Sequence, residues 1–262
     1  HTRSRAKAER LLEQGADWAE TPAQAAEGQD AVVSIVSMPE DVQAVHLGPE
    51  GTLSAAHPAP ILIDMTTSNP SLAVSIHEAA GKLGVRAIDA PVSGGDVGAR
   101  EARLSVMVGG EAEAVKEAMP IFHAFGKTIV HHGPAGSGQH AKVVNQLLVA
   151  SSMIGACEAL QYAHRAGLDP ERVLESVSSG AAGSWTISNL APRMVRRDFE
   201  PGFFVDHFVK DLGIAMEEPQ RMGLSLPGLE LAQRLYLGLQ QSGRGRKGTQ
   251  ALLLALEELN AS

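Results

Sequence analysis

Two segments of this chain combine residue types that could bind and reduce a small organic acid. The first, DAPVSGG, ends in the turn Ser93-Gly94-Gly95, which offers backbone N–H groups and a hydroxyl to an anion. The second, residues 136–146, opens a long helix on which Asn145 and Gln146 follow Lys142 at helical spacing. An anion-holding turn and a lysine beside carboxamides indicate an enzyme that acts on a small carboxylate carrying a carbonyl or an alcohol.

Lys142 is the candidate proton donor. It precedes the apolar residues Val143 and Val144, so we expect its surroundings to be partly dry. Burial and the positive end of the helix both disfavour an ammonium, and they should bring the pKa of Lys142 toward neutrality. A general acid for carbonyl reduction needs such a pKa.

Length and composition exclude several classes of protein. The 262 residues, 44% hydrophobic and 20% charged, can fold as one large or two ordinary domains. The net charge of −8 argues against a nucleic acid or an anionic membrane as partner. Cys157 is the single cysteine, which excludes an intrachain disulfide and fits a reducing cytoplasm. The histidines match no zinc spacing, so we expect no metal: His123, His131, His132 and His140.

Alternating elements before residue 133 predict an α/β domain. Two helices are expected over 70–83 and 111–125. The strands are expected over Ala31–Ser37, Ile61–Thr66, Val85–Pro91, Leu104–Val108 and Thr128–His131. This pattern predicts a mainly parallel, doubly wound Rossmann-like sheet, with the ligand over the carboxyl ends of its strands. Met38-Pro39, Thr67 and Ser93-Gly94-Gly95 all fall at such ends.

After Gly138 the strand pattern stops. Residues 139–166 predict one long helix closed by Gly167, and its apolar run over 147–156 indicates a buried helix and no membrane span. Further helices are expected to begin near Pro170, Trp185, Asp206, Pro227 and Thr249. We therefore expect an NAD(P)-binding domain over 1–135 and an all-helical domain over 136–262, joined through the long helix.

The stretch from Gly136 to Ala141 imitates the G-x-G-x-x-A dinucleotide fingerprint. A true fingerprint is followed by a second strand with a charged residue at its end, whereas here helices follow. We interpret these glycines as an interdomain turn that lets substrate approach Lys142.

Further segments, in the same order, resemble the β-hydroxyacid dehydrogenase family. Besides the two above, they are residues 64–70, 104–110, 182–185, 199–203 and 210–212. The family includes 3-hydroxyisobutyrate dehydrogenase, tartronate semialdehyde (2-hydroxy-3-oxopropionate) reductase and glyoxylate/succinic semialdehyde reductase. The resemblance implies a 6-phosphogluconate dehydrogenase-like helical domain. It also implies that the first strand, the glycine-rich loop and the first helix precede His1, which then lies at the end of a strand.

The resemblance also assigns roles to individual residues. Lys142 would give a proton as hydride arrives, Asn145 and Gln146 would orient the substrate, and Ser93-Gly94-Gly95 would hold its carboxylate. Met38-Pro39 would line the cofactor. Thr67 would lie near the nicotinamide, and Arg3, in Thr2-Arg3-Ser4, would lie beside the adenosine ribose. A guanidinium there suits a 2′-phosphate, which favours NADP over NAD.

Three residues of the helical domain complete the set. On sequence alone, Phe203 reads as a core aromatic, and Lys210 and Asp211 as a solvated charge pair. The resemblance places the three across a cleft from the first domain. There Phe203 would lie near the nicotinamide, Lys210 near the cofactor and Asp211 near the substrate.

Together with these patterns, the family resemblance implies a cytoplasmic, NADP-preferring, homo-oligomeric oxidoreductase (dimer or tetramer) that interconverts a small 3-hydroxy acid and its semialdehyde. Residues 181–185 and 189–193 resemble the tartronate semialdehyde branch. Methylmalonate semialdehyde (3-hydroxyisobutyrate) is the second candidate, and succinic semialdehyde or glyoxylate the third. An imine reductase on this fold usually lacks the lysine. A non-catalytic binding protein would be expected to lose some of Thr67, Ser93, Lys142 and Asp211.

Overall fold

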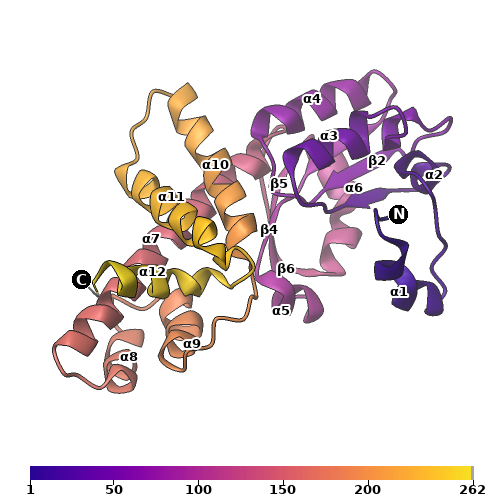
Figure 1. Ribbon diagram of the computed structural model, residues 1–262. Helices are drawn as coiled ribbons and strands as arrows, with labels where there is room; N and C mark the ends of the chain where they lie inside the picture. The colour runs from indigo at the N-terminus through magenta and orange to yellow at the C-terminus, as the bar shows by residue number, and fades with distance from the viewer. Residues whose placement is uncertain (261–262) are drawn as a thin grey trace. The chain divides into compact units, whose positions relative to one another are not determined.

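The structure is a computed structural model that describes residues 1–260, and the chain divides into two compact units (Figure 1). The first comprises His1–Gly94 and Gly98–Lys142, and the second comprises Gly95–Val97 and the chain from Val143 onward. The predicted domain boundary after residue 135 lies just before the long helix and stays a prediction.

The first unit contains a mixed sheet of six strands within residues 1–260. They are β1 (Val32–Ser34), β2 (Ile61–Asp64), β3 (Arg86–Asp89), β4 (Val92–Ser93), β5 (Leu104–Gly109) and β6 (Gly126–Gly133). β1, β2 and β3 are parallel neighbours, and β5 is parallel to β6. β5 runs antiparallel to β3 and β4. The predicted Rossmann-like doubly wound fold is confirmed, with an antiparallel β4 that the apolar pattern did not indicate.

Helices cover both faces of this sheet because its central strands are apolar on both sides. Ile61 and Ile63 of β2 pack in one cluster with α6 (Ala112–His123), whereas Leu62 packs in another with α3 (Pro39–Leu47) and α4 (Pro70–Gly81). Figure 1 shows α3 and α4 side by side. The other helical elements here are η1 (Arg5–Ala8), α1 (Glu9–Glu13), α2 (Pro22–Ala26) and η2 (Thr52–Ser54), and α5 (Gly95–Arg100) belongs to this unit from Gly98 onward.

The expected strand end at His1 is not observed. Residues 1–4 pair with no strand, and the first regular element is η1. The side chain of Arg3 instead donates to Asp41 of α3.

The second unit is helical. α7 (Ser137–Arg165) enters it from the first unit. The other elements are α8 (Pro170–Ser178), η3 (Thr186–Leu190), α9 (Ala191–Val195), α10 (Val205–Arg221), α11 (Pro227–Leu239), η4 (Gln240–Arg244), η5 (Thr249–Ala251) and α12 (Leu252–Leu259). In the described part of this unit, extended pairing is limited to an isolated bridge between Phe204 and Gly248.

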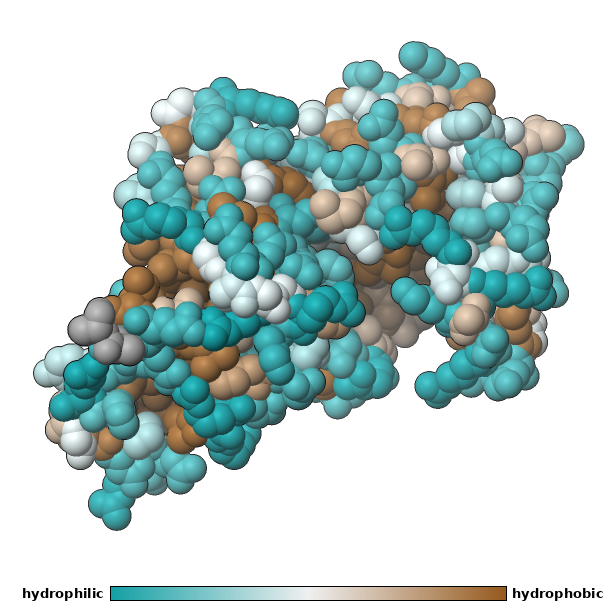
Figure 2. Space-filling view, viewed as in Figure 1, coloured by the Kyte–Doolittle hydropathy of each residue, from teal (hydrophilic) through white to brown (hydrophobic). Residues whose placement is uncertain are grey.

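Helix α7 forms part of the second unit's core. Among residues 1–260, it is the one helix with the length and composition to cross a membrane. Its side chains Ala150, Met153 and Cys157 are nevertheless almost completely buried against α9 to α12, as expected for a core helix. The face of the molecule in Figure 2 is mainly hydrophilic, with separate hydrophobic patches.

Candidate active site

The carboxyl ends of the three parallel strands bring polar residues to one edge of the sheet. Ser34, Asp64 and Asp89 end β1, β2 and β3, and they are direct neighbours in register. All three are buried, with at most 9% of their surface exposed. In a doubly wound sheet, this is the edge where ligands bind.

Lys142 lies beside strand β4. It is 6% exposed, and its Nζ donates a hydrogen bond of 2.9 Å to the carbonyl of Val92, the residue before Ser93. Two predicted site residues, Ser93 and Lys142, are 49 positions apart in sequence, and this bond brings them close together within the first unit.

The turn after Ser93 requires glycine. Gly94 and Gly95 have φ of +132° and +65°, in the region that side chains disfavour. A Cβ on Gly94 would also lie 3.1 Å from a methyl of Leu104. Ser93, Gly94 and the start of α5 therefore form a tight turn whose shape depends on both glycines.

A second polar cluster lies in the second unit. Asn145 Nδ2 donates to Gln146 Oε1 at 2.7 Å, and Gln146 Nε2 donates to Asp211 Oδ2. Lys210 Nζ lies 2.8 Å from Asp211 Oδ1, and these two side chains are only 9% and 2% exposed. The interpretation of Lys210 and Asp211 as a solvated pair is therefore wrong. They are buried because α10 packs Phe208 and Leu212 into the core.

Three predicted cofactor residues meet beyond the end of β1. Arg3 is 78% exposed and pairs with Asp41 at 3.0 Å. Asp41 also accepts a hydrogen bond from the backbone N–H of Met38, which precedes Pro39 at the start of α3. Arg3 is thereby held beside Met38 and Pro39.

The structure places Thr67 and Phe203 in separate units. Thr67 follows the end of β2, and Phe203 packs partly buried against the helical core. The centroid of the Phe203 ring lies 5.9 Å from that of Phe208. Phe203 therefore packs as the core aromatic residue that the sequence alone suggested. Its role at a nicotinamide stays a prediction.

Comparison with known proteins agrees with this arrangement. The family described as "NAD binding domain of 6-phosphogluconate dehydrogenase" matches residues 1–133. The family described as "NAD-binding of NADP-dependent 3-hydroxyisobutyrate dehydrogenase" matches residues 136–256. "Probable 3-hydroxyisobutyrate dehydrogenase-like 1, mitochondrial" of Arabidopsis thaliana is 52% identical over 98% of this chain and 77% of its own length. The chain belongs to the β-hydroxyacid dehydrogenase family.

Two further relatives match most of this chain. The 2-hydroxy-3-oxopropionate reductase of Escherichia coli is 35% identical over 95% of this chain and 86% of its own. The structure of Mycobacterium tuberculosis 3-hydroxyisobutyrate dehydrogenase with L-serine is 28% identical, with a TM-score of 0.87 over 97% of this chain and 88% of that one. The family predicted from sequence motifs is confirmed, and the protein is an NAD(P)-dependent oxidoreductase.

The residues present in this β-hydroxyacid dehydrogenase fit a nicotinamide dinucleotide. The edge at Ser34, Asp64 and Asp89 is the one at which a doubly wound sheet binds such a ligand. The exposed guanidinium of Arg3 lies at that end of β1. No group of three His, Cys, Asp or Glu residues that could hold a metal occurs within residues 1–260.

Motif reasoning missed a buried network behind this edge. Ser34 Oγ and Thr66 Oγ1 both donate to Asp64 Oδ1, at 2.9 and 2.8 Å. Because the Ser34 proton goes to Asp64, His46 Nε2 must donate to Ser34, and its Nδ1 must accept from Thr52. Burial raises the pKa of Asp64 to about 6, although the two hydroxyls oppose it, and burial lowers the pKa of His46 to about 4. The network joins residues that share no motif.

One of the two glycines that imitate a fingerprint, Gly138, has a packing role that was not expected. A Cβ on Gly138 would lie 2.4 Å from the Met107 carbonyl oxygen and 2.7 Å from that of Asp89. Gly138 therefore lets α7 approach β3 and β5 closely, and this contact lies inside the first unit. The interpretation of the glycines over 136–138 as a turn that lets substrate approach Lys142 stays a prediction, and Gly138 also serves helix–sheet packing.

Proposed function

We propose that this β-hydroxyacid dehydrogenase interconverts a small 3-hydroxy acid and its semialdehyde, with Lys142 as the proton-transfer residue and NADP(H) preferred over NAD(H). The observation that carries the proposal is the buried ammonium of Lys142 at 2.9 Å from the Val92 carbonyl, directly before the Ser93 turn. A cation and an anion-holding turn at one strand end suit a substrate with a carbonyl near a carboxylate.

Each side chain then has a distinct task. When bound, a nicotinamide supplies hydride in reduction and accepts it in oxidation. Lys142 gives its proton to the carbonyl oxygen in reduction and takes it back in oxidation. Ser93 Oγ and the N–H groups of Gly94 and Gly95 hold the carboxylate.

The amides on the next turn of α7 orient the substrate. Asn145 and Gln146 offer donors and acceptors to its oxygens. Asp211 fixes Gln146 by accepting from its Nε2, and Lys210 balances the charge of Asp211. The amide of Asn145, which donates to Gln146 Oε1, can then exchange this hydrogen bond for one to the ligand.

Cofactor preference is assigned to Arg3. Its ion pair with Asp41 is exposed, and such pairs contribute little, so a 2′-phosphate can replace the carboxylate. Arg3→Ala should weaken NADPH binding by ~1.5–3 kcal/mol, or about 10–100-fold, and leave NADH unchanged. Fluorescence titration of both cofactors measures this effect, with the exposed Arg5→Ala as the matched control. Equal losses for NADPH and NADH would contradict the assignment.

Tartronate semialdehyde is the proposed substrate. Two observations support it: the resemblance of residues 181–185 and 189–193 to that branch, and the 35% identity with the Escherichia coli 2-hydroxy-3-oxopropionate reductase. The test is a panel of tartronate, methylmalonate and succinic semialdehydes and glyoxylate, each with NADPH and with NADH. The largest kcat/KM is expected for tartronate semialdehyde with NADPH. A larger value for methylmalonate semialdehyde would favour a 3-hydroxyisobutyrate dehydrogenase.

A cytoplasmic homo-oligomer, dimer or tetramer, completes the proposal. Its support is three exposed apolar side chains of α7, since Val144, Leu148 and Tyr162 are 56%, 66% and 75% exposed. The lone Cys157 fits a reducing compartment. Sedimentation velocity of wild type and Leu148→Glu tests the assembly. A monomer in both would contradict it.

A further inference from the structure

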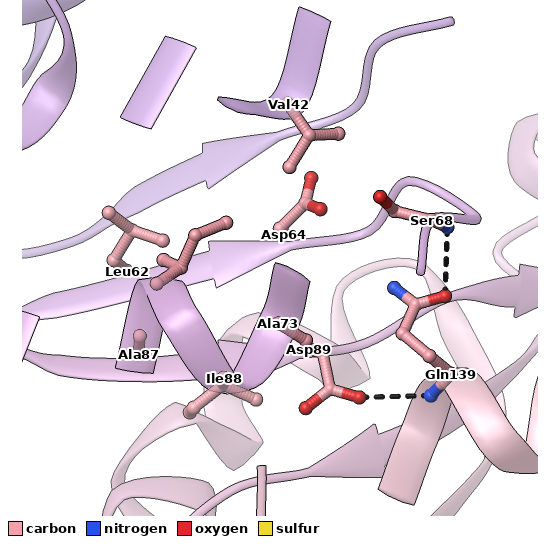
Figure 3. Close-up of a pocket in the computed structure, with 10 residues that line it drawn as sticks. Val42, Leu62, Asp64, Ser68, Ala73, Ala87, Ile88, Asp89 and Gln139 are labelled. Atoms are coloured by element: carbon pink, nitrogen blue, oxygen red, sulfur yellow. Dashed lines mark hydrogen bonds between the residues drawn. The ribbon is translucent and has the colours of Figure 1, made fainter. Parts of the chain in front are cut away.

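Asp89, the last residue of β3, has no task in the proposed chemistry, yet it holds the start of α7. Its Oδ1 accepts from the backbone N–H of Gly136 at 2.7 Å. Its Oδ2 accepts from the backbone N–H of Gln139 at 2.9 Å (Figure 3). The first N–H groups of a helix have no partner inside the helix. Asp89 therefore caps α7 from a neighbouring strand, in the place of a capping residue in the chain before the helix.

The close fit around Asp89 fixes the position of the helix on the sheet. A Cβ on Gly109 would lie 2.6 Å from Asp89 Oδ1, and one on Gly138 would lie 2.8 Å from Asp89 Oδ2. Neither position has room for a larger residue. The carboxylate is thus enclosed by the backbone of β5 on one side and of α7 on the other.

Gln139 ties the same turn of α7 to the loop after β2. Its Oε1 accepts from the N–H of Ser68 at 2.9 Å, and its Nε2 donates to the carbonyl of Thr66 at 2.7 Å. Figure 3 shows Gln139 between Ser68 and Asp89, and only 1% of its surface is exposed. The first turn of α7 is therefore anchored to two strand ends at once.

Lys142 follows Gln139 by three residues, and Val92 follows Asp89 by three residues. The two segments are joined at both ends, by Asp89 to Gln139 and by Lys142 to Val92. We propose that Asp89 is a positioning residue, which holds the first turn of α7 so that Lys142 meets the carbonyl oxygen of the substrate. This inference rests on the proposed role of Lys142.

The protonation state of Asp89 is consistent with this role. Burial raises the pKa of its carboxyl, whereas the N–H groups of Gly136 and Gln139 lower it. The N–H groups favour the ionised form because only a carboxylate accepts hydrogen bonds with both oxygens. An asparagine side chain has only one acceptor oxygen. Its NH2 group would therefore face one of the two backbone N–H groups, so that two donors would oppose each other. Asp89→Asn is therefore the substitution that breaks the cap at nearly constant volume.

The test compares Asp89→Asn with Glu218→Gln, which alters another buried carboxylate, one that pairs with Arg221 of its own helix and has no part in the proposed site. Three quantities are measured: kcat and KM, NADPH affinity, and the rate of reductive methylation of Lys142, followed by peptide mass spectrometry. In Asp89→Asn, kcat should fall ~10–100-fold, as small displacements of reacting groups do. Lys142 should be methylated at least ~5-fold faster while NADPH affinity changes less than twofold.

Glu218→Gln should lower the melting temperature without changing kcat or the methylation rate. If Asp89→Asn shows this same pattern, Asp89 is only structural and the proposal is overturned. Should Asp89→Asn fail to fold, Gln139→Met loosens the same turn and should give the same fall in kcat and the same faster methylation. Unchanged values in Gln139→Met would overturn the proposal.

Lys142→Ala, assayed in parallel, separates this inference from the proposed function. Near-normal turnover in Lys142→Ala would refute the role of Lys142 and, with it, the positioning of Lys142 by Asp89. Lost turnover in Lys142→Ala together with normal kcat in Asp89→Asn would refute the positioning role alone.

Discussion

Two buried carboxylates accept hydrogen bonds from helix α7, at Gln139 and at Gln146, and the charge of each is stabilised differently. In the first unit, Asp89 accepts from the backbone N–H groups of Gly136 and Gln139. In the second unit, Asp211 pairs with Lys210 and accepts from the side chain of Gln146. Backbone donors move only with the helix, whereas side-chain donors can rearrange. The first arrangement therefore suits positioning, and the second suits contact with a ligand that comes and goes.

The largest expected effect is at Lys142, which lies on α7 between Gln139 and Gln146 in sequence. Lys142→Ala should lower kcat by ~10²–10⁴, the range for a positioned general acid, while NADPH still binds. Lys142→Arg should not restore turnover, because a guanidinium keeps its proton at working pH. Steady-state kinetics measures both variants, and the exposed Lys116→Ala, which should be normal, is the control.

The second prediction concerns the ion pair of the helical unit. Asp211→Asn leaves Lys210 buried without its counter-charge and should destabilise the protein by ~3–5 kcal/mol in denaturant unfolding. Lys210→Met combined with Asp211→Asn should recover part of that loss, because the unpaired cation is gone. A double variant as unstable as Asp211→Asn would show that the pair is not the cause.

The third prediction concerns the network of the sheet unit. The neutral form of His46 is favoured by burial, so its contribution to stability is present above pH 6.5 and lost as pH falls through about 4. A pKa lowered from 6.5 to about 4 corresponds to ~3 kcal/mol. His46→Gln removes this dependence, so its instability relative to wild type at pH 7 should shrink by ~2–3 kcal/mol at pH 4.5.

Asp64 sharpens that measurement because its pKa shift has the opposite sign. Burial raises the pKa of Asp64 to about 6, so its contribution is full below pH 3.8 and lost as pH rises through about 6. In wild type, as pH rises from about 4 to about 6, the stability contributed by His46 increases while that contributed by Asp64 decreases. In His46→Gln the fall in stability with rising pH should become visible. A constant difference between variant and wild type from pH 4.5 to 7 would contradict this account.

The smallest expected effect is at the anion turn. Ser93→Ala removes one hydroxyl contact and should raise the KM of a carboxylate substrate about 2–10-fold, from ~0.5–1.5 kcal/mol, with NADPH affinity unchanged. Ser105, which faces Ser93 across β4 and β5, provides the control Ser105→Ala. A defect confined to NADPH binding would favour a tight turn without contact to the acid.

Local patterns predicted much of the fold. The apolar runs around Ile63 and Ile88 predicted buried parallel strands, and the periodicity after Gln139 predicted α7. Strand β4 and helix α5 were not predicted, because Val92 to Arg100 contains glycines and too few apolar residues for either pattern. Strand β4 forms by pairing with β5, which follows α5 in the sequence, so a local pattern could not reveal it.

The candidate site was predictable only where its residues share a motif. Ser93 and Lys142 belong to recognisable segments, and the structure brings them together through Val92. The burial of Lys210 was not predictable, because neighbouring charges on a helix are usually solvated. The link from Ser34 to His46 was also not predictable, because its partners come from separate elements and follow no known spacing.

The central claim is that Lys142 transfers the proton, and the pH dependence of both reaction directions tests it most directly. With saturating NADPH, the rate of semialdehyde reduction should fall at alkaline pH, because only the ammonium donates. With saturating NADP⁺, the rate of oxidation should fall at acidic pH, because only the neutral amine accepts. Both limbs should be absent from the residual activity of Lys142→Ala. Folded, cofactor-binding Lys142→Ala protein with near-normal turnover and unchanged limbs would contradict the account.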